Sequence, residues 1–86
     1  MKRKLSDLKQ EGSQLSPLIS VGKNGITETL VEELIYQLKQ HKLVKVKIQK
    51  TALNNEDKKT LAEELSIRTG SQLIEMRGSN AVLYRK

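Results

Sequence analysis

The strongest pattern in the sequence is a run of aliphatic residues that recurs at the spacing of a helix. Between Ile26 and His41 these residues share one side of a helical projection, and glutamates and glutamines fill the other side. The period predicts an amphipathic helix over this range. Thr27 is expected to cap its start, with Glu28 beside the positive end of the helix dipole. His41, the only histidine, complements the negative end, and we interpret it so rather than as a catalytic group.

Directly after this helix the apolar spacing changes from helical to alternating. Between Leu43 and Lys50 one face of an extended chain carries Val44, Val46 and Ile48, and the other carries Lys45, Lys47 and Gln49. This alternation predicts a half-buried strand. Because ammonium groups line its second face, water or a ligand has to cover that face.

The remaining elements are shorter and are predicted mainly from their end signals. Lys2 to Gly12 is expected to form a short helix closed by a left-handed glycine cap, and Leu18 to Val21 a brief buried strand. Asn54 or Asn55 is expected to cap a further helix that turns Leu61, Ala62 and Leu65 inward and ends before Gly70. Gln72 to Arg77 and Ala81 to Lys86 are predicted strands, joined by the three residues Gly78, Ser79 and Asn80.

The order of elements, α-β-α-β-α-β-β, predicts one two-layer α/β (α+β) domain over residues 1–86. Helical crossovers favour parallel pairing of the strands they join, whereas the final hairpin has to be antiparallel. We therefore expect a mixed four-stranded sheet with the helices mainly on one face and the other face open. The strand order stays undecided.

The amino-acid composition limits the kinds of functional site that the chain can form. With 86 residues the chain has enough apolar residues for one core, and without cysteine it has no disulfides and no thiolate metal sites. It contains no Phe or Trp, and Tyr36 and Tyr84 are interpreted as partly buried core residues rather than stacking platforms. No metal or cofactor is expected. The basic start is interrupted by polar residues instead of leading into a signal sequence, so we expect a cytoplasmic protein.

Positive charge is concentrated in one part of the chain. Sixteen Lys and Arg against ten Asp and Glu give a net charge of +6. Between Glu33 and Glu56 there is no carboxylate, yet this interval holds five lysines. A solvated surface explains single lysines; for five without local counter-charge we favour a surface that binds a polyanion, most commonly nucleic acid.

The sequence Gly22-Lys23-Asn24-Gly25 lies between a predicted strand and the longest predicted helix. Two glycines allow close approach of the backbone to a ligand, Lys23 adds a charge, and the helix start offers unpaired amides, which together suit a phosphodiester. The alternative is a tight turn in which Asn24 and Gly25 have positive φ. Further basic residues are proposed to widen the binding surface: Lys45, Lys47, Arg77 and Arg85, with Lys2, Arg3 and Lys4 at the start of the chain.

Several stretches resemble one known family. Ser16 to Thr27 (SPLISVGKNGIT) resembles the opening of the CRM domain, named for chloroplast RNA splicing and ribosome maturation and found in prokaryotes as small stand-alone YhbY-like proteins. The stretch from His41 to Lys47 (HKLVKVK) and the closing Val82 to Arg85 (VLYR) are similar to further motifs of that family. The sequence departs from it by ending soon after the last predicted strand, where many bacterial members continue with a charged tail.

The resemblance implies an RNA-binding domain similar in fold to the C-terminal domain of translation initiation factor three, with a G-x-x-G loop like that of KH domains. It also implies association with the precursor of the large ribosomal subunit. We therefore expect a non-enzymatic, monomeric protein that binds ribosomal RNA and assists large-subunit assembly. The alternatives are a module whose open sheet docks an acidic protein and, more remotely, a phosphoester enzyme, for which no base or metal cluster is apparent.

Overall fold

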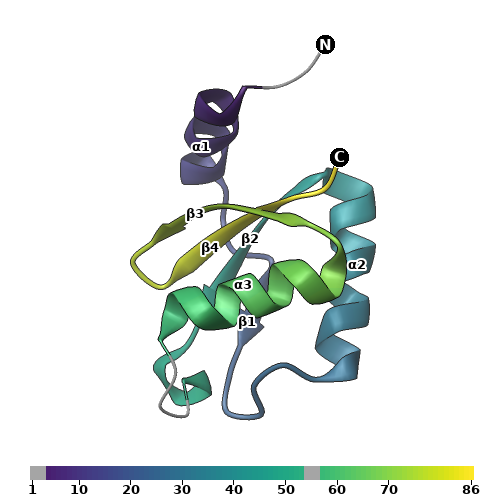
Figure 1. Ribbon diagram of the computed structural model, residues 1–86, viewed down its shortest axis with the longest axis vertical. Helices are drawn as coiled ribbons and strands as arrows, with labels where there is room; N and C mark the ends of the chain where they lie inside the picture. The colour runs from purple at the N-terminus through teal and green to yellow at the C-terminus, as the bar shows by residue number, and fades with distance from the viewer. Residues whose placement is uncertain (1–3, 54–56) are drawn as a thin grey trace.

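A mixed four-stranded sheet forms the centre of the computed structural model, which describes residues 4–53 and 57–86 (Figure 1). Its strands are β1 (Ile19–Val21), β2 (Leu43–Ile48), β3 (Gln72–Arg77) and β4 (Asn80–Tyr84), in the spatial order β1-β2-β4-β3. β1 and β2 are parallel, and β4 is antiparallel to both of its neighbours. The mixed α+β fold is thus confirmed. The strand order, which the sequence left undecided, places the last strand between β2 and β3.

The helices lie on both faces of this sheet. α2 (Glu28–His41) and α3 (Lys58–Thr69) cover one face, and the alternating residues Val44, Val46 and Ile48 are buried beneath them. α1 (Leu5–Gln14) lies on the opposite face, where a second, smaller cluster forms (Figure 1). That cluster consists of Leu8, Leu43, Ile74 and Val82. The second face is therefore only partly open, contrary to expectation. Within the described ranges no helix is long and apolar enough to span a bilayer.

Both long helices begin at a side-chain cap. Thr27 Oγ1 accepts a hydrogen bond from the Leu30 amide at 3.1 Å, which confirms the predicted cap of α2. At α3 the cap is Asp57, whose carboxylate accepts from the Thr60 amide at 2.7 Å. The predicted caps Asn54 and Asn55 lie outside the described residues, and α3 begins later than they would require. Hydrogen bonds from the Thr60 backbone and side chain hold the pKa of Asp57 below its ordinary value of 3.8, so this cap weakens as the pH falls through the lowered pKa.

Gly12 does not form the left-handed cap that the sequence suggested. α1 continues past it to Gln14, and Gly12 is buried against β4. A Cβ atom built on Gly12 would lie 2.7 Å from Val82 Cγ1. The residue is therefore needed for close contact between helix and sheet. Gly70 follows α3 as predicted, and with φ of 65° it forms a left-handed cap there.

Smaller differences concern element ends and one aromatic side chain. β1 begins at Ile19 rather than at Leu18, which is 54% exposed, and β2 is followed by a short 3-10 turn, η1 (Lys50–Ala52). Asn80 belongs to β4, so only Gly78 and Ser79 connect β3 to β4. Tyr36 is 60% exposed on α2, so its assignment to the core was wrong.

Candidate nucleic-acid interface

The loop from Gly22 to Gly25 is a tight exposed turn. The Gly25 amide donates to the Gly22 carbonyl at 2.8 Å, so Lys23 and Asn24 are the two central residues, and both are exposed. Within the loop only Gly25 has a positive φ, of 67°. Gly25 thus meets a backbone requirement, whereas a Cβ on Gly22 would make an ordinary contact with Gln49 Oε1 at 3.4 Å. The tight turn of the alternative interpretation is present, but Asn24 does not have the positive φ expected there. The turn leaves Lys23 exposed.

Hydrogen bonds fasten this loop to one end of the sheet. The Gln49 amide donates to the Val21 carbonyl at 2.9 Å, and Gln49 Nε2 donates to Ser20 Oγ at 2.8 Å. The adjacent turn between β3 and β4 is held in the same way: the Ile48 amide donates to the Ser79 carbonyl at 2.7 Å, and Lys58 Nζ donates to Ser79 Oγ at 2.8 Å. The G-x-x-G loop, the end of β2 and the β3–β4 turn therefore form one connected end of the domain.

A row of polar side chains crosses all four strands at this end. The register pairs Ser20 with Lys47, Lys47 with Asn80, and Asn80 with Arg77. Since directly paired residues project from the same face, these four residues, here called the polar row, lie side by side on the α1 face. Ser20, Lys47 and Arg77 are exposed, and Asn80 is half-buried with its Oδ1 atom shielded and without a hydrogen-bond partner. Arg77 Nε lies 3.8 Å from Glu75 Oε2, too far for strong pairing, and its side chain is 70% exposed.

The other predicted binding residues do not join the polar row. Lys45 lies on the same face, but α1 and its following connector partly cover it, and its Nζ donates to the Leu15 carbonyl at 3.1 Å. Arg85 lies at the opposite end of the sheet, where its amide donates to the Lys42 carbonyl at 2.8 Å. Lys4 is exposed at the start of α1, and Lys2 and Arg3 fall outside the described residues. The structure therefore brings together the G-x-x-G loop, Lys47 and Arg77.

The start of α2 is less suited to phosphate than the sequence indicated. Thr27 already satisfies the Leu30 amide, and the Glu28 carboxylate in the first turn opposes a second anion at the same helix end. The neighbouring turn residues Lys23 and Asn24 are exposed and carry no carboxylate. Among the described residues no three His, Asp or Glu side chains gather in a way that would hold a metal ion.

Ser20, Asn80 and Gln49 were not anticipated from the sequence. Ser20 and Asn80 enter the interface only through strand register, and Gln49 through its hydrogen bond to Ser20. The alternation of β1 and β4 assigns these residues to a face, but pairing across four strands is needed to place them in one row.

A model of the CRS1/YhbY (CRM) domain matches residues 1–85. The chain belongs to the CRM family. Among similar CRM relatives are proteins named as probable RNA-binding proteins from Pseudomonas aeruginosa and Bacillus subtilis. The first is 36% identical over 91% of this chain and 73% of the relative, and the second is 30% identical over 92% and 80%. A further one from Methanocaldococcus jannaschii is 36% identical over 98% of this chain and 66% of its own length.

The CRM fold assignment is supported by a solved structure. The solution structure of a hypothetical protein from Staphylococcus aureus superposes with a TM-score of 0.80 at 34% sequence identity, covering 95% of this chain and 83% of that one. The family resemblance seen in the sequence is therefore confirmed, and the fold of this CRM domain agrees with that of its relative.

Proposed function

We propose that this CRM domain binds structured RNA through the G-x-x-G loop and the polar row. The observation that carries the proposal is the convergence of Lys23, Lys47 and Arg77, all exposed, at one end of the sheet beside a tight glycine turn. Such a surface is complementary to a sugar-phosphate backbone. The names of the bacterial and archaeal relatives support RNA as the ligand.

The mechanism is binding rather than catalysis. Lys23 donates hydrogen bonds to one phosphate, while Lys47 and Arg77 contact phosphates farther along the strand. The exposed Ser20 hydroxyl adds a hydrogen-bonding group for ribose hydroxyls. Because no aromatic side chain belongs to the polar row, this part of the interface recognises the shape and backbone of the RNA more than its base sequence.

The RNA we propose is ribosomal RNA in the precursor of the large subunit, bound by a monomer in the cytoplasm. This part rests on the resemblance to stand-alone YhbY-like proteins. Crosslinking in cells followed by sequencing of the bound RNA tests it. Enrichment of large-subunit precursor RNA is the expected result; enrichment of transfer RNA or intron RNA, or a partner complex that survives nuclease treatment, would contradict it.

Lys47 is expected to matter more for RNA binding than a lysine at the other end of the molecule. Lys47→Gln should lower affinity about three- to tenfold at low salt, since one phosphate contact is lost. Lys39 is exposed on α2, and Lys39→Gln changes the net charge by the same amount. This variant should lower the RNA affinity less than twofold. Fluorescence anisotropy with one structured RNA fragment measures both. Equal losses would show that only net charge matters and that the polar row is not the contact surface.

A further inference from the structure

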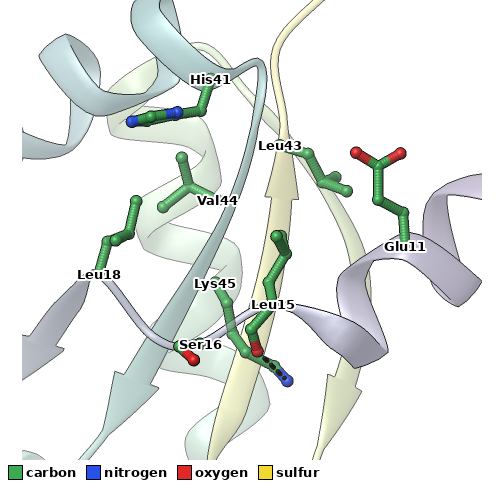
Figure 2. A pocket seen from close by; sticks show the side chains of 8 residues that line it. All are labelled: Glu11, Leu15, Ser16, Leu18, His41, Leu43, Val44 and Lys45. Atoms are coloured by element: carbon green, nitrogen blue, oxygen red, sulfur yellow. Dashed lines mark hydrogen bonds between the residues drawn. The ribbon is translucent and has the colours of Figure 1, made fainter.

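A cleft of about 350 Å³ lies at the end of β2 that is remote from the G-x-x-G loop. Figure 2 shows that it is formed where four segments meet: α1 with Glu11, the connector from Leu15 to Leu18, the end of α2 with His41, and the start of β2. Leu15, Leu18, Leu43 and Val44 give it apolar walls. The hydrogen bond from Lys45 Nζ to the Leu15 carbonyl closes one side (Figure 2).

Part of the backbone edge of β2 is unpaired along this cleft. The Lys42 carbonyl and the Ile48 amide bond to the β4 side, and β2 pairs with β4 in continuous register, so the even-numbered residues of β2 direct their backbone groups toward β4. The odd-numbered residues therefore point the other way, as the bond from the Leu18 amide to the Lys45 carbonyl confirms. The backbone groups of Leu43 and Lys45 therefore point away from β4, toward the side on which the cleft lies.

β1 does not reach far enough to pair with this edge. Its first contact with β2 is the bond from the Leu18 amide, and the preceding residue, Pro17, has no amide hydrogen. Within the described ranges no hydrogen bond occupies the Leu43 carbonyl or the Lys45 amide. The Leu43 carbonyl and the Lys45 amide are therefore an acceptor and a donor two residues apart on the same strand edge, beside the apolar walls; Glu11 and Ser16 also line the cleft. Small-molecule sites typically combine apolar walls with a few fixed polar groups of this kind.

We propose that this cleft binds one unpaired nucleobase of the RNA by its Watson–Crick edge. Each base presents a donor and an acceptor side by side on that edge, which complements the Leu43 carbonyl and the Lys45 amide. His41 and Leu18, both exposed at the cleft, supply a ring and an aliphatic surface against which a base can stack. The proposal rests on the proposed function and adds to backbone recognition a single base-specific contact.

Two observations favour a base over an extended peptide. The free edge is too short for strand addition, which uses a row of main-chain bonds, whereas a base needs only two. Lys47 of the polar row also lies on β2, four residues after Leu43 and therefore about 13 Å from it at 3.3 Å per residue. An RNA strand held at the polar row can therefore extend to the cleft.

Titration with mononucleotides, followed by amide NMR of the whole protein, tests the cleft directly. Uridine 5′-monophosphate is expected to shift the Lys45 amide signal saturably. Its 3-methyl analogue, in which a methyl group blocks the N3 donor, should bind at least about fivefold more weakly, the lower end of the discrimination by a paired base edge. Ribose 5-phosphate should leave the signal unmoved.

Leu18→Ala should weaken nucleotide binding at least threefold, and Leu5→Ala, a similarly exposed leucine on α1 that does not line the cleft, should not. Equal shifts with the methylated and unmethylated nucleotides, or shifts of Lys45 only with an added hydrophobic peptide, would overturn the proposal. These outcomes are independent of the proposed function, because the loss of RNA binding at the G-x-x-G loop does not alter a mononucleotide titration of the cleft.

Discussion

Replacing Lys23 and Asn24 together by aspartate lowers RNA affinity about 10- to 100-fold at low salt. The change removes one cation and adds two anions where a phosphate is expected to lie. Stability should be nearly unaffected, because both side chains are exposed and aspartate is well tolerated in turns. Fluorescence anisotropy with a structured RNA fragment, together with thermal unfolding, measures the two effects separately.

A matched control comes from α1, where Lys9 and Gln10 are exposed neighbours. Changing both to aspartate alters the net charge by the same amount, and its effect on affinity should be several times smaller. If the loop variant bound RNA as well as the unchanged protein, the Gly22–Gly25 segment would be an ordinary turn and the interface would have to lie elsewhere.

Replacing Gly12 by valine lowers the free energy of unfolding by about 2 kcal/mol, within the range for overpacking a filled site. The new side chain would start 2.7 Å from Val82 Cγ1, and Val82 is itself buried on the sheet. α1 has to move away from β4 to accommodate it. For a domain of this size the midpoint of thermal unfolding should fall by about 10 °C.

The control for this prediction is Ser13→Val at the next, exposed position of α1, where an effect below about 0.5 kcal/mol is expected. Combining Gly12→Val with Val82→Ala should cost less than the sum of the single changes, because the smaller residue makes room for the larger one. Additive costs would show that Gly12 does not act through contact with Val82.

The elements of this fold that are marked by strong local signals could be predicted from the sequence. The aliphatic stripe and Thr27 defined α2, the alternation after Leu43 defined β2, and Gly70 marked the end of α3. In each case the pattern of burial and the end signal lie within one element. They can therefore be interpreted without knowing what the element packs against.

The position of α1 could not be predicted in the same way. A glycine near the end of a short helix fits a left-handed cap and close packing equally well, since both require the absence of Cβ. Which one applies at Gly12 depends on Val82, seventy residues later in the chain. The insertion of β4 between β2 and β3 is likewise a matter of long-range pairing that no local period encodes.

The candidate site was predictable only in part for the same reason. Lys47 and Arg77 were selected for their charge, and their meeting at one end of the sheet depends on the β2–β4–β3 register. Arg85 was also predicted from its charge alone, but it follows the end of β4 and lies at the opposite end of the sheet. The cleft beside Leu43 depends on where β1 begins, which the sequence placed one residue too early.

The central claim is that exposed cations at one end of this sheet hold the phosphates of an RNA strand. The most direct test is the dependence of RNA affinity on salt concentration. With about three phosphates contacted by Lys23, Lys47 and Arg77, the logarithm of the association constant should fall against the logarithm of the salt concentration with a slope of about −2 to −3. A slope near zero would contradict the claim.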